Sequence, residues 1–167
     1  MTEATAPEKP HKPTAEEKRR MKSAARLYAV QALFQMEASG QGVDRIVREF
    51  EVHRFGLAQD EEGTELAEGD ANLFRRLLDD AVTWQAKIDQ ATDRALAANW
   101  PIDRIDPVLR AVFRAAGAEL VNPDTPPKVV INEFVEVARA FFPEGREVKF
   151  VNAVLDHMAR ALRPDGF

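Results

Sequence analysis

Cysteine is absent from the 167 residues of this sequence. Disulfides, thiolate nucleophiles and zinc sites built on cysteine are therefore excluded, and the absence fits a reducing cytoplasm. The sequence also lacks a run of about 18 apolar residues, the length that a membrane-spanning helix requires, and its N-terminus lacks the apolar stretch of a secretory signal. We expect a cytoplasmic protein without a membrane span, and a hydrophobic content of 45% is sufficient for one globular domain.

The usual signatures of enzyme active sites are missing as well. There is no GxxxxGK[ST] loop to bind phosphates and no HExxH pair to bind zinc. The three histidines, His11, His53 and His157, are scattered, and the side chains of Asp79 and Asp80 would diverge by about 100° on a helix. Although residues far apart in sequence can converge in a fold, these absences favour a protein that is not an enzyme and holds no metal or cofactor.

Charge is distributed unevenly along the chain. The net charge is −5, yet residues 9–26 contain seven lysines and arginines against two glutamates, whereas residues 27–167 sum to −8. A basic segment on an acidic body indicates a polyanionic partner for the segment and a basic protein partner for the body. A solubilising tail on a solvated body is the alternative interpretation.

Helical periodicity dominates the pattern of apolar residues. Residues 1–13 have no such period and are expected to form a disordered tail, ahead of one helical domain over residues 14–167. Thr14 and Glu17 have the spacing of a capping box, which predicts a helix from Thr14 to about Ala38. Further helices are expected over residues 44–55, 70–99 with a break near Thr83, 106–121, 125–141 and 146–163. No alternating run is long enough for a central strand, so the predicted class is all-α.

The first predicted helix divides into two halves. Its basic residues precede an apolar stripe formed by Leu27, Val30, Leu33 and Phe34. The pattern predicts an exposed cationic half and a buried apolar half. We assign Phe34 to the core rather than to a partner contact.

Four motifs in order then carry a family resemblance. They are "AVQALF" at 29–34, "FRAAGAEL" at 113–120, "PPKVVINE" at 126–133 and "KFVNAVLD" at 149–156. Together they resemble the NusB family of bacterial transcription antitermination factors, and the resemblance spans residues 18–163. The chain departs from the family pattern where Ser23-Ala24-Ala25 replace part of an arginine-rich stretch, and where Gly117-Ala118 replace an aromatic residue before the Glu-Leu pair. The loop at residues 143–147 also differs in length from some members.

The resemblance implies a compact bundle of about seven helices in two sub-bundles, without catalysis. Proteins of this family pair with NusE, a small-subunit ribosomal protein, and the pair binds the boxA element of nascent RNA. They join RNA polymerase with other Nus factors, so that ribosomal RNA operons are read through. The cationic half of the first helix would then contact RNA phosphates, and the acidic body would suit a basic ribosomal protein.

The residues expected to bind RNA come from the basic stretch within residues 9–26 and from the later helices and motifs. They are Lys18, Arg19, Arg20, Lys22, Arg26, Arg110, Lys128, Lys149 and Phe150. Phe150 can either stack on a base beside the cation of Lys149 or belong to the core, and the sequence leaves both interpretations open. Asn132 and Glu133 are expected to fix helix packing or a cap rather than to touch RNA.

Two other classes stay open. One is a purely structural helical adaptor without an RNA role. The other is a stand-alone relative of the NusB-like domain that precedes the catalytic domain of some ribosomal RNA cytosine methyltransferases. The sequence has no catalytic cysteine and no room for a cofactor-binding α/β domain, which argues against methyl transfer.

Overall fold

The computed structural model describes residues 12–55, 70–96 and 101–167, and within them it contains seven α-helices and no strand. The helices are α1 (Ala15–Ser39), α2 (Val43–Phe50), α3 (Ala71–Thr83), α4 (Gln85–Ala95), α5 (Pro107–Leu120), α6 (Pro127–Phe141) and α7 (Arg146–Leu162). The predicted all-α class is confirmed. Residues 1–11 of the predicted tail lie outside the described residues.

Local signals place the ends of α1 and α5 where the sequence predicts them. The Thr14 side chain accepts a hydrogen bond from the Glu17 amide at 3.1 Å, which caps α1. Gly40 ends the same helix in the left-handed conformation, with φ of 73°, a geometry that glycine adopts without steric cost. Asp106 caps α5 through the Val108 amide, and Pro107 occupies its first turn, where an N–H is not required.

Two predicted helices differ in detail. The expected helix over 44–55 changes at Glu51 into a π-helical turn, Glu51–Phe55. The expected break near Thr83 is confirmed, because α3 ends there and α4 begins at Gln85. Helix α4 ends at Ala95, before the end predicted at about Asn99, and residues 97–100 lie outside the described part of the chain.

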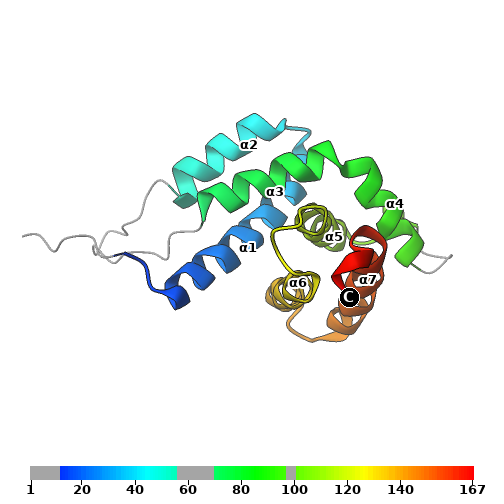
Figure 1. The fold of residues 1–167 in the computed structure, drawn as a ribbon. Coiled ribbons are helices and arrows are strands. Elements are labelled where there is room, and N and C mark those ends of the chain that lie inside the picture. The colour runs from blue at the N-terminus through cyan, green and yellow to red at the C-terminus, as the bar shows by residue number, and fades with distance from the viewer. Residues whose placement is uncertain (1–11, 56–69, 97–100) are drawn as a thin grey trace, which may run out of the picture.

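The helices form two groups that share α5. Helices α1, α2 and α3 lie on one side of α5, and α4, α6 and α7 lie on the other side (Figure 1). Helix α5 contacts α1, α3, α4, α6 and α7. Its small residues allow this crowding: a Cβ on Gly117 would lie 2.4 Å from Cγ2 of Ile88 in α4. The space that a larger residue would occupy at Gly117 is therefore filled by Ile88 of α4.

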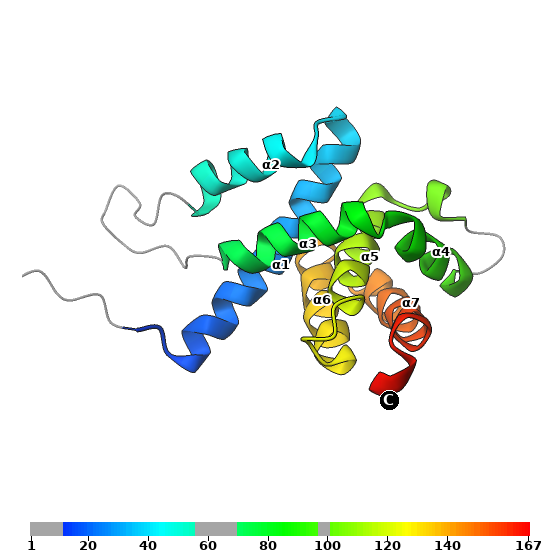
Figure 2. The same ribbon diagram turned by 45° about the horizontal axis from the view of Figure 1, so that its top comes forward.

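The core is continuous across both groups. One cluster of buried apolar side chains includes Phe74 of α3, Phe113 of α5 and Phe134 of α6, all fully buried. The first turns of α1 project away from α4–α7 in both ribbon views (Figure 2). No helix in the described ranges has both the length and the apolar character needed to cross a membrane.

Candidate nucleic-acid interface

The projecting part of α1 carries a group of exposed cations. Lys18, Arg19, Arg20 and Lys22, here called the basic segment, are all exposed. Arg20 forms an ion pair with Glu16 at 2.9 Å, and the two side chains are 68% and 70% exposed. A pair so exposed contributes little stability, so Arg20 can exchange Glu16 for a phosphate at small cost.

Arg26, one turn after Lys22, is buried instead. Its side chain is 4% exposed, and Nε and Nη2 donate to the two carboxylate oxygens of Glu119 at 2.7 and 2.8 Å. Nη1 lies 3.4 Å from Glu133, which also accepts a hydrogen bond from the Ser23 hydroxyl at 2.9 Å. The expectation that Arg26 belongs to the exposed cationic half is wrong, because its charge is paired inside the bundle.

The surroundings of Arg26 act on its pKa in opposite directions. Desolvation by burial lowers the pKa, whereas the hydrogen bond and charge of Glu119 raise it, with a smaller contribution from Glu133. The net effect raises the pKa of Arg26 above its ordinary value. The guanidinium therefore stays charged, and Glu133 has the packing role predicted for it.

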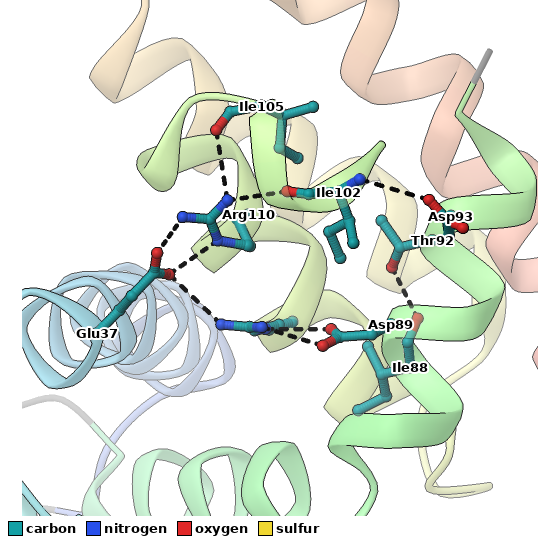
Figure 3. A network of polar contacts seen from close by, with 9 residues as sticks. Glu37, Ile88, Asp89, Thr92, Asp93, Ile102, Ile105 and Arg110 are labelled. Carbon is teal, nitrogen blue, oxygen red and sulfur yellow. Dashed lines mark hydrogen bonds and ion pairs between the residues drawn. The ribbon is translucent and has the colours of Figure 1, made fainter. Parts of the chain in front are cut away.

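Arg110 lies far from the basic segment. It donates through Nε to Glu37 at 2.9 Å and through Nη1 to the Ile102 carbonyl at 2.8 Å, and its Nη2 also contacts Glu37 (Figure 3). Glu37 is 19 residues after Lys18 on the same helix, which is about 28 Å at 1.5 Å per residue. The placement of Arg110 therefore does not extend the basic segment.

A second guanidinium completes the contacts around Glu37. Arg114 lies 3.4 Å from Glu37 and makes two hydrogen bonds to Asp89 of α4, at 3.1 and 3.0 Å. The hydrogen bond from Arg110 lowers the pKa of Glu37 against the opposing effect of desolvation. These ion pairs join α1, α4 and α5 along a cleft of 680 Å³.

Lys128 is exposed in the first turn of α6. Thr125, three residues earlier, lines a cavity of 370 Å³ together with Lys22 and Arg26. Arg76 of α3 borders the same cavity and lies 3.4 Å from Asp124 in an exposed ion pair. The sequence pattern does not single out Arg76, because its proximity to Lys22 depends on how α3 crosses α1.

Lys149 and Phe150 face different surroundings. Lys149 is exposed, whereas Phe150 is half-buried with its ring centroid 6.2 Å from that of Phe113 in an edge-to-face arrangement. Phe150 also lines a pocket of 510 Å³, here called the Phe150 pocket, which Arg104 and Arg146 border. The ring is thus partly packed and partly accessible, so the structure is compatible with both interpretations of Phe150. The two arginines are cations that the sequence pattern does not single out.

Phe34 is not a core residue. Its side chain is 40% exposed, and it lines a groove of 310 Å³, here called the Phe34 groove. The other residues of the groove are Val30, Gln31, Gln35, Ala38, Val108 and Phe141. The buried face of α1 passes through Val30 and Leu33, and Phe34 lies at the edge of that face, where Val108 of α5 and Phe141 of α6 cover it only in part.

Comparison with known proteins gives consistent matches. The model of the NusB family matches residues 23–160. A Maricaulis maris protein named Transcription antitermination protein NusB is 47% identical over 154 residues, which cover 92% of this chain and 94% of that protein. A Caulobacter vibrioides protein of the same name is 51% identical over 143 residues, covering 85% and 94%.

Solved structures show the same fold. The structure of T. maritima NusB has a TM-score of 0.67 at 30% identity and covers 86% of this chain and 93% of that one. A structure of antitermination factors NusB and NusE in complex with dsRNA has a TM-score of 0.68 at 22% identity, covering 89% and 99%. The second likeness concerns the fold alone.

Proposed function

The chain belongs to the NusB family, and from this premise we propose that it is a transcription antitermination factor that pairs with NusE and binds boxA RNA. Its place of action would be the bacterial cytoplasm, in the complex that RNA polymerase forms with other Nus factors. No catalytic step belongs to this function. The basic segment, exposed on an otherwise acidic protein, is the observation that carries the proposal.

The charge distribution supports RNA binding at the projecting end of α1. Residues 27–167 carry a net charge of −8, which repels a polyanion from most of the surface. By contrast, the cations Lys18, Arg19 and Lys22 are exposed near the start of α1, and each can neutralise one phosphate. RNA would therefore approach this end first.

The Phe150 pocket suits an unpaired base. Single-stranded RNA is bound by aromatic rings that stack on bases and by cations that hold the neighbouring phosphates. Phe150 offers a partly accessible ring, and Arg104 and Arg146 border the same pocket. Lys149 lies next to the ring in sequence and is exposed. We propose that this pocket is a second RNA contact.

The Phe34 groove suits the protein partner. An exposed phenylalanine beside Phe141 and Val108 provides an apolar centre, the kind of surface on which protein interfaces form. The groove lies toward the C-terminal half of α1, whereas the basic segment lies at its start. NusE and RNA would therefore contact different parts of one helix without competing.

The test uses two triple variants of equal charge. Lys18, Arg19 and Lys22 are changed to alanine in one, and the exposed Arg45, Arg48 and Arg94 are changed to alanine in the other as the matched control. Binding of labelled boxA RNA is titrated at several salt concentrations. The first variant should reduce the slope of log affinity against log salt by about 0.7 for each lost single-strand phosphate contact, or roughly 2 in total.

The control variant should keep the slope of the unaltered protein, because it changes the net charge equally but removes no proposed contact. Equal slopes for the two variants would contradict the assignment of RNA to α1. Absence of boxA RNA binding by the unaltered protein at every salt concentration would instead favour the structural adaptor.

A further inference from the structure

We propose that the buried ion pair between Arg26 and Glu119 positions the basic segment for RNA, so that both are positioning residues and neither contacts RNA. The inference rests on the proposed function, because it concerns how α1 presents its cations. It also assigns Ser23 and Glu133 to the same task.

The basic segment is not fixed by apolar packing of its own. Among residues 15–24 none is buried, and the first buried residue of α1 is Ala25. Three polar contacts fix this part of the helix to three other parts of the fold. Arg26 binds Glu119 of α5, Ser23 donates to Glu133 of α6, and the amide of Asp70, the N-cap of α3, donates to the Met21 carbonyl at 2.9 Å.

Helical spacing links these contacts to the exposed cations. Residues four apart lie on one face of a helix. Lys18, Lys22 and Arg26 therefore form one row, in which the first two are exposed and the third is buried on Glu119. Arg19 likewise lies one turn before Ser23, which donates to Glu133. Lys22 and Arg19 each lie one turn before a residue that is fixed to another helix, so the direction of these two cations follows from the contacts of Arg26 and Ser23.

The geometry of the ion pair restricts rotation and sliding of α1. Two parallel N–H···O bonds, at 2.7 and 2.8 Å, fix both the position and the plane of the guanidinium. Arg26 and Glu119 are 4% and 2% exposed, so a turn of the helix would leave both charges unpaired away from water. An apolar pair could fill this space with equal or greater stability, whereas the ion pair also specifies orientation.

The pair adjoins the place where RNA would lie. Arg26 and Glu119 line the 370 Å³ cavity that Lys22 and Arg76 border. They are nevertheless almost inaccessible, so a phosphate at this cavity would meet the exposed cations first. The buried ion pair therefore lies directly behind the exposed cations that would contact RNA, where it can fix their position.

The decisive variant is Glu119→Gln in the full chain. It keeps the shape of the side chain and every exposed cation, but it removes one negative charge and one half of the ion pair. Charge alone predicts tighter RNA binding, because the net charge rises from −5 to −4. Positioning predicts the opposite: weaker binding of labelled boxA RNA, with a salt slope lower by about 0.7 for each phosphate that the displaced segment no longer reaches.

A stability control accompanies this variant. Ile88→Val removes one methylene from the buried face of α4 and changes none of the three polar contacts of α1, so it should lower the melting temperature while leaving the salt slope unchanged. Both proteins are assayed at a temperature where circular dichroism shows them folded. RNA affinity of Glu119→Gln at or above that of the unaltered protein, with an unchanged slope, would overturn the inference.

Ser23→Ala keeps the inference testable if Glu119→Gln does not fold. It removes the hydrogen bond to Glu133 without changing any charge, and it should also reduce the salt slope. An unchanged slope in Ser23→Ala would overturn the inference in that case. Failure of the proposed function is recognised separately, because the triple variant of the basic segment would then keep the slope of the unaltered protein too.

Discussion

Phe150 allows stacking and packing to be separated quantitatively. Removal of a fully buried phenylalanine ring costs about 3–5 kcal/mol of unfolding free energy. Phe150 is partly buried: its ring packs edge-to-face with that of Phe113, and it also lines the Phe150 pocket. We therefore expect Phe150→Ala to lower the free energy of unfolding by somewhat less than that amount, about 2–3 kcal/mol. RNA binding should weaken by about 1–3 kcal/mol, the range for one stacked base.

Phe150→Leu distinguishes the two contributions. Leucine retains most of the apolar contact with Phe113, so the loss of unfolding free energy should stay below about 1.5 kcal/mol, as for volume-conserving changes in cores. It lacks a flat aromatic face, so the loss of RNA affinity should be nearly that of the alanine variant. Urea unfolding and titration of labelled boxA RNA measure the two quantities. RNA affinity unchanged in Phe150→Leu would refute stacking, and a loss of 3–5 kcal/mol of stability in Phe150→Ala would show a core residue.

Two further predictions concern the other end of α1. NusE should tighten the binding of boxA RNA by the unaltered protein, and Phe34→Asp should abolish this effect of NusE. The melting temperature of the variant should change little, because Phe34 is 40% exposed. If NusE still tightens RNA binding by Phe34→Asp, the placement of NusE on the Phe34 groove is contradicted. The hydrogen bond from Arg110 lowers the pKa of Glu37 below its ordinary value of 4.5. The ionised Glu37 side chain therefore contributes fully to the free energy of unfolding above pH 4.5, and this contribution is lost as the pH falls through the folded-state pKa of Glu37. Thermal melts below pH 4.5 should therefore show a smaller pH dependence for Glu37→Gln than for the unaltered protein, and parallel curves would contradict this.

Local interactions let the sequence determine the helices and several of their ends. Thr14 and Glu17 are three residues apart, and the hydrogen bond that caps α1 needs nothing from the rest of the chain. The same holds for Asp106 and Pro107 at the start of α5. The order of motifs likewise allowed the family to be identified, since the comparisons match residues 23–160 to it.

The accessibility of individual side chains was decided by tertiary contacts. Lys22 and Arg26 are both cations in one helical row, yet Lys22 is exposed whereas Arg26 is buried on the carboxylate of Glu119, 93 residues later. Phe34 is apolar like its buried neighbour Leu33, but it lies in a groove beside Val108 and Phe141 that leaves its side chain 40% exposed.

The physical reason is the range of the interactions. A helix cap and an apolar period act within one or two turns and can be read from neighbouring residues. Whether a charge is paired or solvated, and whether a ring is covered, depends on which helix crosses at that point. The sequence by itself therefore determined the elements and the family, while the packing of α5 and α6 on α1 decided which of its cations stay exposed and which is buried.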